Sequence, residues 1–218
     1  MLYTIVNKFF RSNSYILSDE INKRCLIIDP GLYDSEISQR ILELNLRPTA
    51  IISTHGHFDH IGSVSILKSR FDVPFYLHEA DLKLCQSANF FLKMAHLNYT
   101  IDTPSPDFLF KGEMENLSIF GFNLAIYNFP GHSPGSCIIK YDNLLFSGDI
   151  IFKHGIGLGT IPKENKQDMK RSIFNIFNRF SEKDLICPGH GSSEYLGLIK
   201  KNNLELKKFL LSNDVRNE

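Results

Sequence analysis

Residues 49–60 read Thr-Ala-Ile-Ile-Ser-Thr-His-Gly-His-Phe-Asp-His, a short apolar run followed at once by three histidines and an aspartate. The apolar run is short and nearly continuous, which predicts a buried strand over residues 49–53. His55 and His57 are two positions apart, so on a helix their side chains would point roughly 200° apart. They can converge on one ion only from an extended strand or a loop. This stretch therefore predicts metal ligands at the end of a buried strand.

Three further polar clusters also follow apolar, strand-like runs. They are Pro130-Gly-His132-Ser-Pro-Gly135, Phe146-Ser-Gly-Asp149 and Cys187-Pro-Gly-His190-Gly. Ligands collect at strand ends in open α/β sheets, because the loops converge there on a rigid frame. Together the four clusters supply five imidazoles and two carboxylates, namely His55, His57, His60, His132, His190, Asp59 and Asp149. That set is too large for one tetrahedral zinc and fits two ions with open positions for water.

Each cluster taken alone also has an ordinary structural explanation. His132 or His190 could be a turn or core histidine, and Asp149 after Ser-Gly could cap a turn. For the four clusters together this explanation is weak, because it must account for four separate strand ends that each finish in a possible metal ligand. Asp29 begins an Asp-Pro-Gly sequence, and two roles stay open for it. It is either a turn residue or a carboxylate that hydrogen-bonds to a metal ligand and orients it. Ordinary structural roles are expected for His78, His96 and His154.

The rest of the chain alternates short strands with amphipathic helices, an α/β rhythm. Strands are expected at residues 3–6, 14–17, 25–28, 74–77, 117–120, 124–129, 137–140, 144–147 and 185–187. Helices are expected at residues 34–46, 61–71, 169–180 and 200–211. Residues 88–112 are irregular and are predicted to form a long surface excursion, a candidate lid. No Pro/Gly/Ser spacer separates the two similar halves, so we expect one four-layer domain over residues 1–218, with helices outside two packed sheets.

Composition excludes several classes of partner. The chain has 24 basic and 24 acidic residues and a formal net charge of zero, which gives no pull toward nucleic acid or an anionic membrane. The N-terminus lacks signal-peptide features, and no apolar run approaches the roughly 20 residues of a membrane span. A cytoplasmic location is therefore expected. Free, buried thiols are expected at the widely spaced Cys25, Cys85, Cys137 and Cys187.

The histidine and aspartate clusters occur in a recognisable order. The series His55-x-His57-x-Asp59-His60, Gly131-His132-Ser-x-Gly135, Ser147-Gly-Asp149 and Pro188-Gly-His190-Gly resembles the motifs of the metallo-β-lactamase superfamily, specifically its glyoxalase II-like branch. The resemblance implies an αββα sandwich. It also implies one metal ion held by His55, His57 and His132, a second held by Asp59, His60 and His190, and Asp149 bridging the two. Lactamases of this superfamily lack such a bridging carboxylate, which argues against a lactamase.

The resemblance further implies a reaction. The chain is similar to short hydroxyacylglutathione hydrolases, which implies hydrolysis of a small thioester with two divalent ions, zinc or else iron or manganese. A hydroxide bridging the ions would attack the carbonyl carbon, and Asp59 would orient or deprotonate it as the catalytic residue. Two ions among these ligands leave a local charge of about +2, so we expect a small anionic substrate. The oligomeric state stays open.

Two departures from the branch concern substrate recognition. Full-length glyoxalase II carries an extra helical domain with glutathione contacts, and we expect none here because only about 28 residues follow His190. Leu158 and Thr160 stand where short homologues carry an arginine and an aspartate, so recognition of glutathione stays open. The alternative is a persulfide dioxygenase, which shares these motifs and uses one iron. A nuclease of the superfamily would need a basic track that the balanced charge does not indicate.

Overall fold

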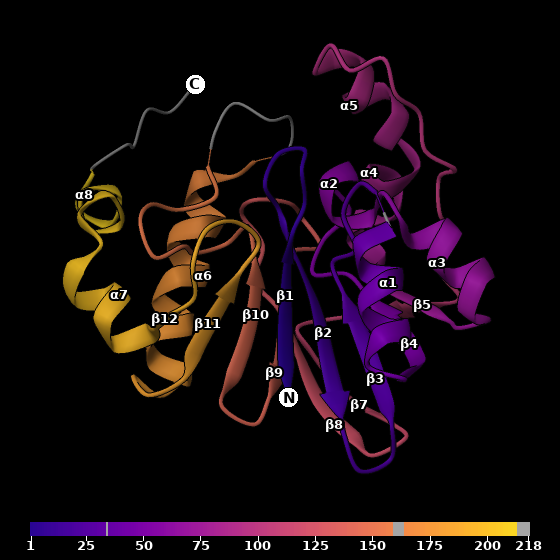
Figure 1. The fold of residues 1–218 in the computed structure, drawn as a ribbon. Helices are drawn as coiled ribbons and strands as arrows, with labels where there is room; N and C mark the ends of the chain where they lie inside the picture. The colour runs from indigo at the N-terminus through magenta and orange to yellow at the C-terminus, as the bar shows by residue number, and fades with distance from the viewer. Residues whose placement is uncertain (34, 159–163, 213–218) are drawn as a thin grey trace.

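Two six-stranded sheets face each other in the computed structural model, with helices on their outer faces (Figure 1). The structure describes residues 1–33, 35–158 and 164–212. The predicted four-layer α/β sandwich is therefore confirmed. None of the helices in these ranges is long and apolar enough to cross a membrane.

The first sheet carries its strands in chain order. They are β1 (Leu2–Val6), β2 (Asn13–Asp19), β3 (Arg24–Ile28), β4 (Arg47–Ile52), β5 (Phe75–His78) and β6 (Phe108–Phe110). β1 to β3 pair antiparallel, whereas β3 to β6 pair parallel. The carboxyl ends of β3, β4 and β5 therefore meet at one edge of the sheet, where Asp29 and the 53–60 segment follow.

The second sheet has the order β12-β11-β10-β9-β8-β7. Its strands are β7 (Met114–Ile119), β8 (Phe122–Asn128), β9 (Cys137–Tyr141), β10 (Leu144–Gly148), β11 (Leu185–Pro188) and β12 (Glu194–Tyr195). β10 and β11 are parallel, with Phe146 opposite Cys187, so both strands end at the same edge. Asp149 and His190 follow these two ends. The backbone N–H of Cys137 donates to the carbonyl of Thr54 at 2.8 Å, which joins this sheet to the first.

Helices cover the outer face of each sheet. The first group is α1 (Ser35–Glu43), α2 (Phe58–Ile61), α3 (Val64–Phe71), the 3-10 helix η1 (Glu79–Asp81), α4 (Leu82–Gln86) and α5 (Ala88–Met94). The second group is α6 (Lys166–Arg179), α7 (Leu196–Asn202) and α8 (Leu204–Leu211). Strand β3 shows why three apolar layers result: Ile27 packs toward the first helix group, while Leu26 and Ile28 pack between the sheets. Both faces of the central strands are buried, as is typical of covered parallel sheets.

Two expected segments differ from the structure. Residues 88–112 are not a surface excursion throughout, because α5 and β6 lie within them and bury Leu92 and Phe110. The helix expected at 200–211 is two helices, α7 and α8, that meet at Asn203. The Asn203 side chain accepts from the N–H of Leu206 at 2.9 Å and donates to the carbonyl of Phe152 at 3.1 Å. The hydrogen bond from Asn203 to a distant loop therefore explains why α7 and α8 are separate helices.

Other expectations agree with the structure. All four cysteines are free and buried, as predicted. The predicted helix at 34–46 corresponds to α1, although Asp34 lies outside the described residues. Thr160 also lies outside them.

Candidate metal centre

The seven side chains singled out from the sequence meet at one edge of the two sheets. They come from the segment after β4 (His55, His57), from α2 (Asp59, His60), from the β8–β9 loop (His132), and from the ends of β10 (Asp149) and β11 (His190). Six of these side chains are buried, and His190 is partly exposed. Segments distant in sequence therefore supply a single cluster of imidazoles and carboxylates.

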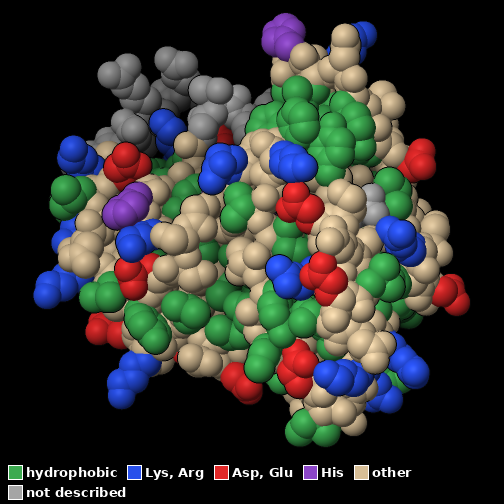
Figure 2. All heavy atoms as spheres, in the orientation of Figure 1, with side chains coloured by type: hydrophobic (Ala, Val, Ile, Leu, Met, Phe, Trp, Pro, Cys, Tyr) green, Lys and Arg blue, Asp and Glu red, His purple; other side chains and the backbone are tan. Residues whose placement is uncertain are grey.

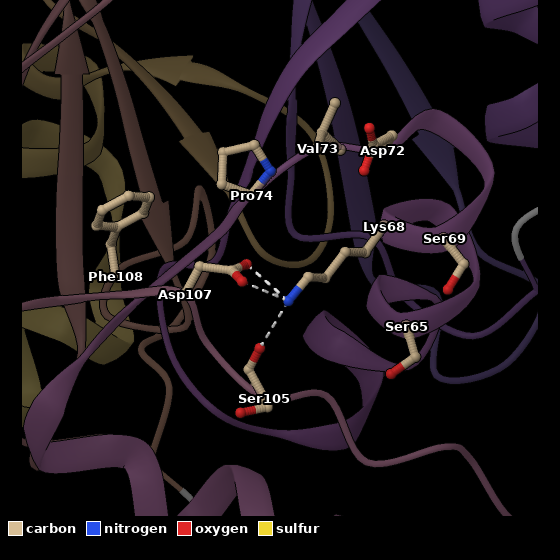
Figure 3. A pocket seen from close by; sticks show the side chains of 9 residues that line it. All are labelled: Ser65, Lys68, Ser69, Asp72, Val73, Pro74, Ser105, Asp107 and Phe108. Carbon is tan, nitrogen blue, oxygen red and sulfur yellow. Dashed lines mark hydrogen bonds and ion pairs between the residues drawn. The ribbon is translucent and has the colours of Figure 1, made fainter.

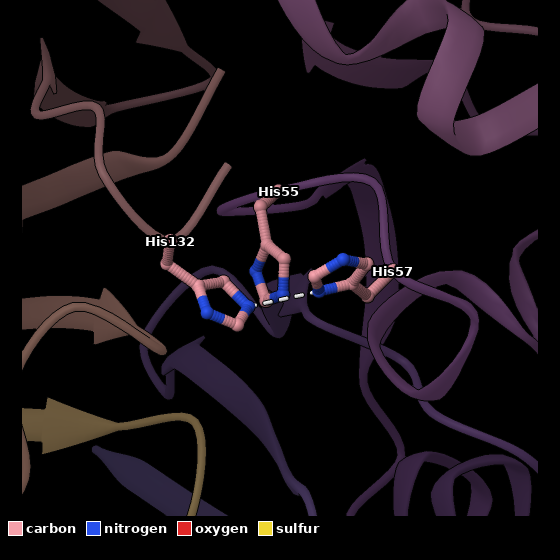
Figure 4. A group of neighbouring side chains, drawn as sticks. All are labelled: His55, His57 and His132. Carbon is pink, nitrogen blue, oxygen red and sulfur yellow. Dashed lines mark hydrogen bonds between the residues drawn. The ribbon is translucent and has the colours of Figure 1, made fainter. Parts of the chain in front are cut away.

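Three histidines form the first group within this cluster. Nε2 of His132 lies 2.8 Å from Nδ1 of His57, and the His55 ring centroid is 4.8 Å from each of the other two (Figure 4). One ring nitrogen from each histidine lies within 4.8 Å of the others. Three imidazole nitrogens at this spacing can ligate one ion.

A second group lies beside the first and contains carboxylates. Nε2 of His190 is 3.3 Å from Oδ2 of Asp59 and 3.3 Å from Oδ2 of Asp149. Nε2 of His60 is 3.4 Å from Oδ1 of Asp149. The same Oδ2 of Asp149 also lies 3.7 Å from Nε2 of His132 in the first group. Asp149 therefore lies between the two groups.

Asp29 lies behind the cluster rather than in it. Its Oδ1 accepts from the N–H of Thr54 at 2.7 Å, and its Oδ2 accepts from the Thr54 hydroxyl at 2.7 Å. The same Oδ2 is 3.1 Å from Nδ1 of His60. Because the Thr54 hydroxyl donates to Asp29, it accepts from Nδ1 of His55, 3.1 Å away. Of the two roles left open by the sequence, the structure favours support of ligands from behind.

These contacts assign ring protons in three of the histidines. Nδ1 of His132 lies 2.8 Å from the carbonyl oxygen of Gly157 and so carries a proton, as do Nδ1 of His55 and of His60. When these rings are neutral, the Nε2 atom of each therefore keeps its lone pair. This is the tautomer that an imidazole needs in order to bind a metal through Nε2.

The described residues also leave several buried polar atoms of this cluster without a hydrogen-bond partner. They include Nε2 of His55, Nε2 of His60 and Oδ1 of Asp149. Buried polar atoms are rarely unpaired, so such a set calls for a partner that the protein does not supply. Imidazole nitrogens and carboxylate oxygens together are a ligand set that divalent zinc, iron and manganese accept. The residues present therefore fit a pair of divalent ions.

The two groups differ in protonation. Burial holds the pKa of His55 well below its usual range, and burial beside His132 lowers the pKa of His57 to about 3. Burial opposes charge on His60 and His190 as well, but Asp149 and Asp59 raise the pKa of His60 well above normal and that of His190 to about 9. His55 and His57 in the first group are thus neutral imidazoles. In the second group, protons on His60 and His190 balance the negative charges of Asp59 and Asp149, and a bound cation would displace these protons.

Sequence reasoning missed Asp81, which ties together two of the ligand-bearing loops. This fully buried carboxylate, in η1, accepts from the N–H of Gly56 at 2.9 Å and from the Ser133 hydroxyl at 2.6 Å through Oδ2. Its Oδ1 accepts from the N–H of Gly135 at 2.7 Å. Gly56 lies between His55 and His57, and Ser133 follows His132. Asp81 therefore positions the first histidine group without joining it.

A separate pocket of about 690 Å³ lies between α3 and the segment before β6 (Figure 3). Its Lys68 donates to Oδ1 of Asp107 at 2.7 Å and to the carbonyl of Ser105 at 3.2 Å. None of the seven clustered side chains lines this pocket. It offers no reactive group comparable with those of the metal centre.

Comparison with known proteins agrees with this geometry. Residues 7–190 match the family Lactamase_B, described as the Metallo-beta-lactamase superfamily. The chain is 35% identical to "Probable metallo-hydrolase YqgX" of Bacillus subtilis over 184 residues, 83% of this chain and 85% of that protein. It is also 35% identical to "Hydroxyacylglutathione hydrolase GloC" of Haemophilus influenzae over 201 residues, 91% of this chain and 93% of that protein.

Solved structures show the same fold. The BLEG-1 B3 metallo-beta-lactamase superposes with a TM-score of 0.83 and 30% identity, covering 97% of this chain and 100% of that one. TTHA1623, solved in a di-iron-bound form, gives a TM-score of 0.81 and 28% identity over 93% of this chain and 98% of that one. ETHE1 from Myxococcus xanthus gives a TM-score of 0.77 at 17% identity over 96% of this chain and 88% of that one, a likeness of fold alone.

Proposed function

The chain belongs to the metallo-beta-lactamase superfamily, and from that premise we propose that it is a dinuclear metal-dependent hydrolase of small thioesters. The observation that carries the proposal is the position of Asp149 between the two groups, 3.3 Å from His190 and 3.7 Å from His132. A carboxylate so placed can bind two ions at once. The 35% identity to a hydroxyacylglutathione hydrolase favours a thioester substrate.

We assign His55, His57 and His132 to one ion, and Asp59, His60 and His190 to the other, with Asp149 shared. Zinc is the proposed metal, with iron or manganese as alternatives. When bound, two divalent ions lower the pKa of water toward neutrality and stabilise negative charge that develops on a carbonyl oxygen. The remaining chemistry belongs to residues of the chain.

Asp59 is the proposed catalytic residue. Its Oδ2 lies 3.3 Å from Nε2 of His190 and 3.6 Å from Nε2 of His60, so the carboxylate faces the centre. The Ser12 hydroxyl donates to the Asp59 carbonyl at 2.7 Å and fixes its backbone. Burial opposes ionisation, but the two histidines hold the pKa of Asp59 below its usual value, so the carboxylate is ionised at neutral pH. An ionised, fixed carboxylate can orient an attacking water and accept its proton.

The proposed substrate is a small anionic thioester. Two divalent ions on five neutral imidazoles and two carboxylates give a local charge of about +2, which attracts an anion. Leu158 is partly buried against the apolar cluster that includes Met169 and Ile173 of α6, and it follows Gly157, whose carbonyl holds His132. An apolar side chain at this position cannot pair with the charge of an anionic thiol portion.

The test is metal analysis of the purified protein combined with an assay of S-D-lactoylglutathione hydrolysis. We expect two divalent ions per chain and thioester turnover that is lost on chelation and restored by metal. Two further assays, with a β-lactam and with glutathione persulfide under oxygen, separate this function from those suggested by the superfamily. One iron per chain with oxygen consumption and no hydrolysis would overturn the proposal in favour of a persulfide dioxygenase.

A further inference from the structure

The turn between β1 and β2, residues 8–11, is followed by Ser12 and Asn13, which form hydrogen bonds on both sides of the second ligand group. On one side the Ser12 hydroxyl donates to the Asp59 carbonyl at 2.7 Å. On the other, the N–H of Asn13 donates to the Gly189 carbonyl at 2.6 Å, and the Asn13 side chain donates to the Gly191 carbonyl at 2.7 Å. The position of this turn is therefore fixed relative to Asp59 and His190.

An open pocket of about 690 Å³ lies between this turn and residues 190–193. It shares His190 with the candidate metal centre, and its wall also includes Phe10, Arg11 and Ser192. Among the described residues that line this wall, Arg11 is the one cation other than histidine, and none is a carboxylate. The pocket thus borders the metal centre at His190, and Arg11 supplies a positive charge in its wall.

Arg11 differs in its ion pairing from Lys8, in the same turn, and from Lys153. Nζ of Lys8 lies 3.5 Å from Glu36, and Nζ of Lys153 lies 3.2 Å from Glu194. Among the residues that the structure describes, no carboxylate forms an ion pair with Arg11. Arg11 (φ 54°) and Phe10 (φ 58°) both adopt the left-handed conformation, which side-chain-bearing residues seldom do.

The other flank of the metal centre is aromatic. Phe91, in α5, lies 6.4 Å from His57 between ring centroids. Hydrophobic side chains gather around α5 on the face shown in Figure 2, and exposed Phe90 and Met94 belong to that helix. The cation of α5 is Lys93, in its last turn, whereas residues 87–92 carry no charge, so a charged group placed against Phe91 would lose hydration without a partner. The anionic part of a substrate is therefore favoured on the Arg11 flank, beside His190.

We propose that Arg11 binds the anionic end of the thiol portion of the substrate in the pocket beside His190, and so determines specificity. This inference rests on the proposed thioester hydrolysis. A guanidinium forms paired, charge-assisted hydrogen bonds with either a carboxylate or a phosphate. The anionic group is therefore the carboxylate of a peptide-like thiol or the phosphate of a nucleotide-like thiol.

The kinetic test compares Arg11→Gln with wild type on three thioesters that share one acyl group: S-lactoylglutathione, lactoyl-coenzyme A and the neutral S-lactoyl-N-acetylcysteamine. Arg11→Gln removes the charge and shortens the side chain while keeping a polar end group. We expect KM to rise about tenfold for an anionic substrate with kcat unchanged, because a contact present equally in the ground and transition states is lost. Values for the neutral thioester should not change. Arg11→Lys should restore most of the loss, and Lys8→Gln is the matched control.

The two anionic substrates identify the source of the charge. A KM effect confined to S-lactoylglutathione indicates a carboxylate, and one confined to lactoyl-coenzyme A indicates a phosphate. Equal effects of Arg11→Gln on charged and neutral thioesters, or no effect on any, would overturn the inference while leaving the proposed hydrolysis intact.

A binding measurement makes the inference independent of turnover. Calorimetry with S-methylglutathione and with coenzyme A, neither of which is hydrolysed, is carried out on the metal-loaded protein. We expect at least one to bind wild type about tenfold more tightly than Arg11→Gln, with the difference shrinking at high salt. If Arg11-dependent binding is present but no thioester is hydrolysed, the proposed function fails and the anion site stands. If neither compound depends on Arg11, the anion site fails.

Discussion

Oδ2 of Asp29 lies 3.1 Å behind Nδ1 of His60, and both side chains are fully or almost fully buried. The same carboxylate holds Thr54, whose hydroxyl faces His55. One residue outside the ligand set therefore orients an imidazole in each of the two groups. This is the arrangement by which a supporting carboxylate fixes the tautomer and direction of metal-binding histidines.

Substitution of Asp29 by asparagine should weaken metal binding. Asparagine keeps the size of the side chain and tolerates the left-handed backbone at this position (φ 51°), but it cannot accept all three hydrogen bonds. We expect metal affinity, measured by competition with a chelator, to fall about 10- to 100-fold. Asp142→Asn is the matched control, because Asp142 also has a positive φ (50°) and lies in the exposed β9–β10 turn. Equal affinities for the two variants would contradict the role given to Asp29.

Removal of Asp149 should separate metal binding from folding. If its carboxylate is shared by two ions, Asp149→Ala should bind fewer than two ions per chain and lose at least about 100-fold in kcat for the thioester. Far-ultraviolet circular dichroism should stay close to that of wild type, since the variant removes no core side chain. Elemental analysis and steady-state kinetics give the two readouts. A variant with two bound ions and near-normal kcat would show that Asp149 does not bridge them.

The local motifs around the ligands were predictable from sequence, whereas contacts between distant loops were not. His55, His57, His132 and His190 each follow an apolar run that signals a strand end, and a strand end fixes where its next residues point. Asp81 gave no such signal, because a single aspartate in His-Glu-Ala-Asp is ordinary turn chemistry until the loops at Gly56 and Gly135 meet around it. The same holds for Asn203, whose partners in the 152–155 loop are about 50 residues away.

Asp81→Asn tests that missing link directly. Asparagine would place an NH₂ group against donors from Gly56, Ser133 or Gly135, leaving buried hydrogen bonds unmade. Such a loss costs about 1–3 kcal/mol, which lowers Tm by roughly 2–10 °C for a chain of this size. Thermal denaturation of the metal-free protein gives the measurement, with the exposed Asp102→Asn as control. A Tm equal to that of the control would show that Asp81 does not hold the two loops together.

Gly189→Ala should displace the shared carboxylate without altering any ligand. A Cβ at this position would overlap Oδ1 of Asp149 and lie 2.7 Å from Cε1 of His60, closer than real Cβ contacts. Both side chains would have to move, so we expect loss of metal and of activity together. Isothermal titration with zinc measures the first and thioester hydrolysis the second. The control is Ser69→Ala, an exposed position in α3. Normal zinc binding by Gly189→Ala would refute the close approach.

The buried thiols predict a pH dependence that does not involve the metal centre. Burial raises the pKa of Cys25, Cys85 and Cys187 to about 12, whereas a thiol in the unfolded chain titrates near about 8.5. Between these values the folded protein holds more protons than the unfolded chain, so stability should fall as pH rises above about 9. The thiolate is the reactive form, so native protein at pH 8 should not react with Ellman's reagent, whereas protein unfolded in guanidinium should release four equivalents. Rapid reaction of even one thiol in the native protein would show that a cysteine is accessible, contrary to the packing described.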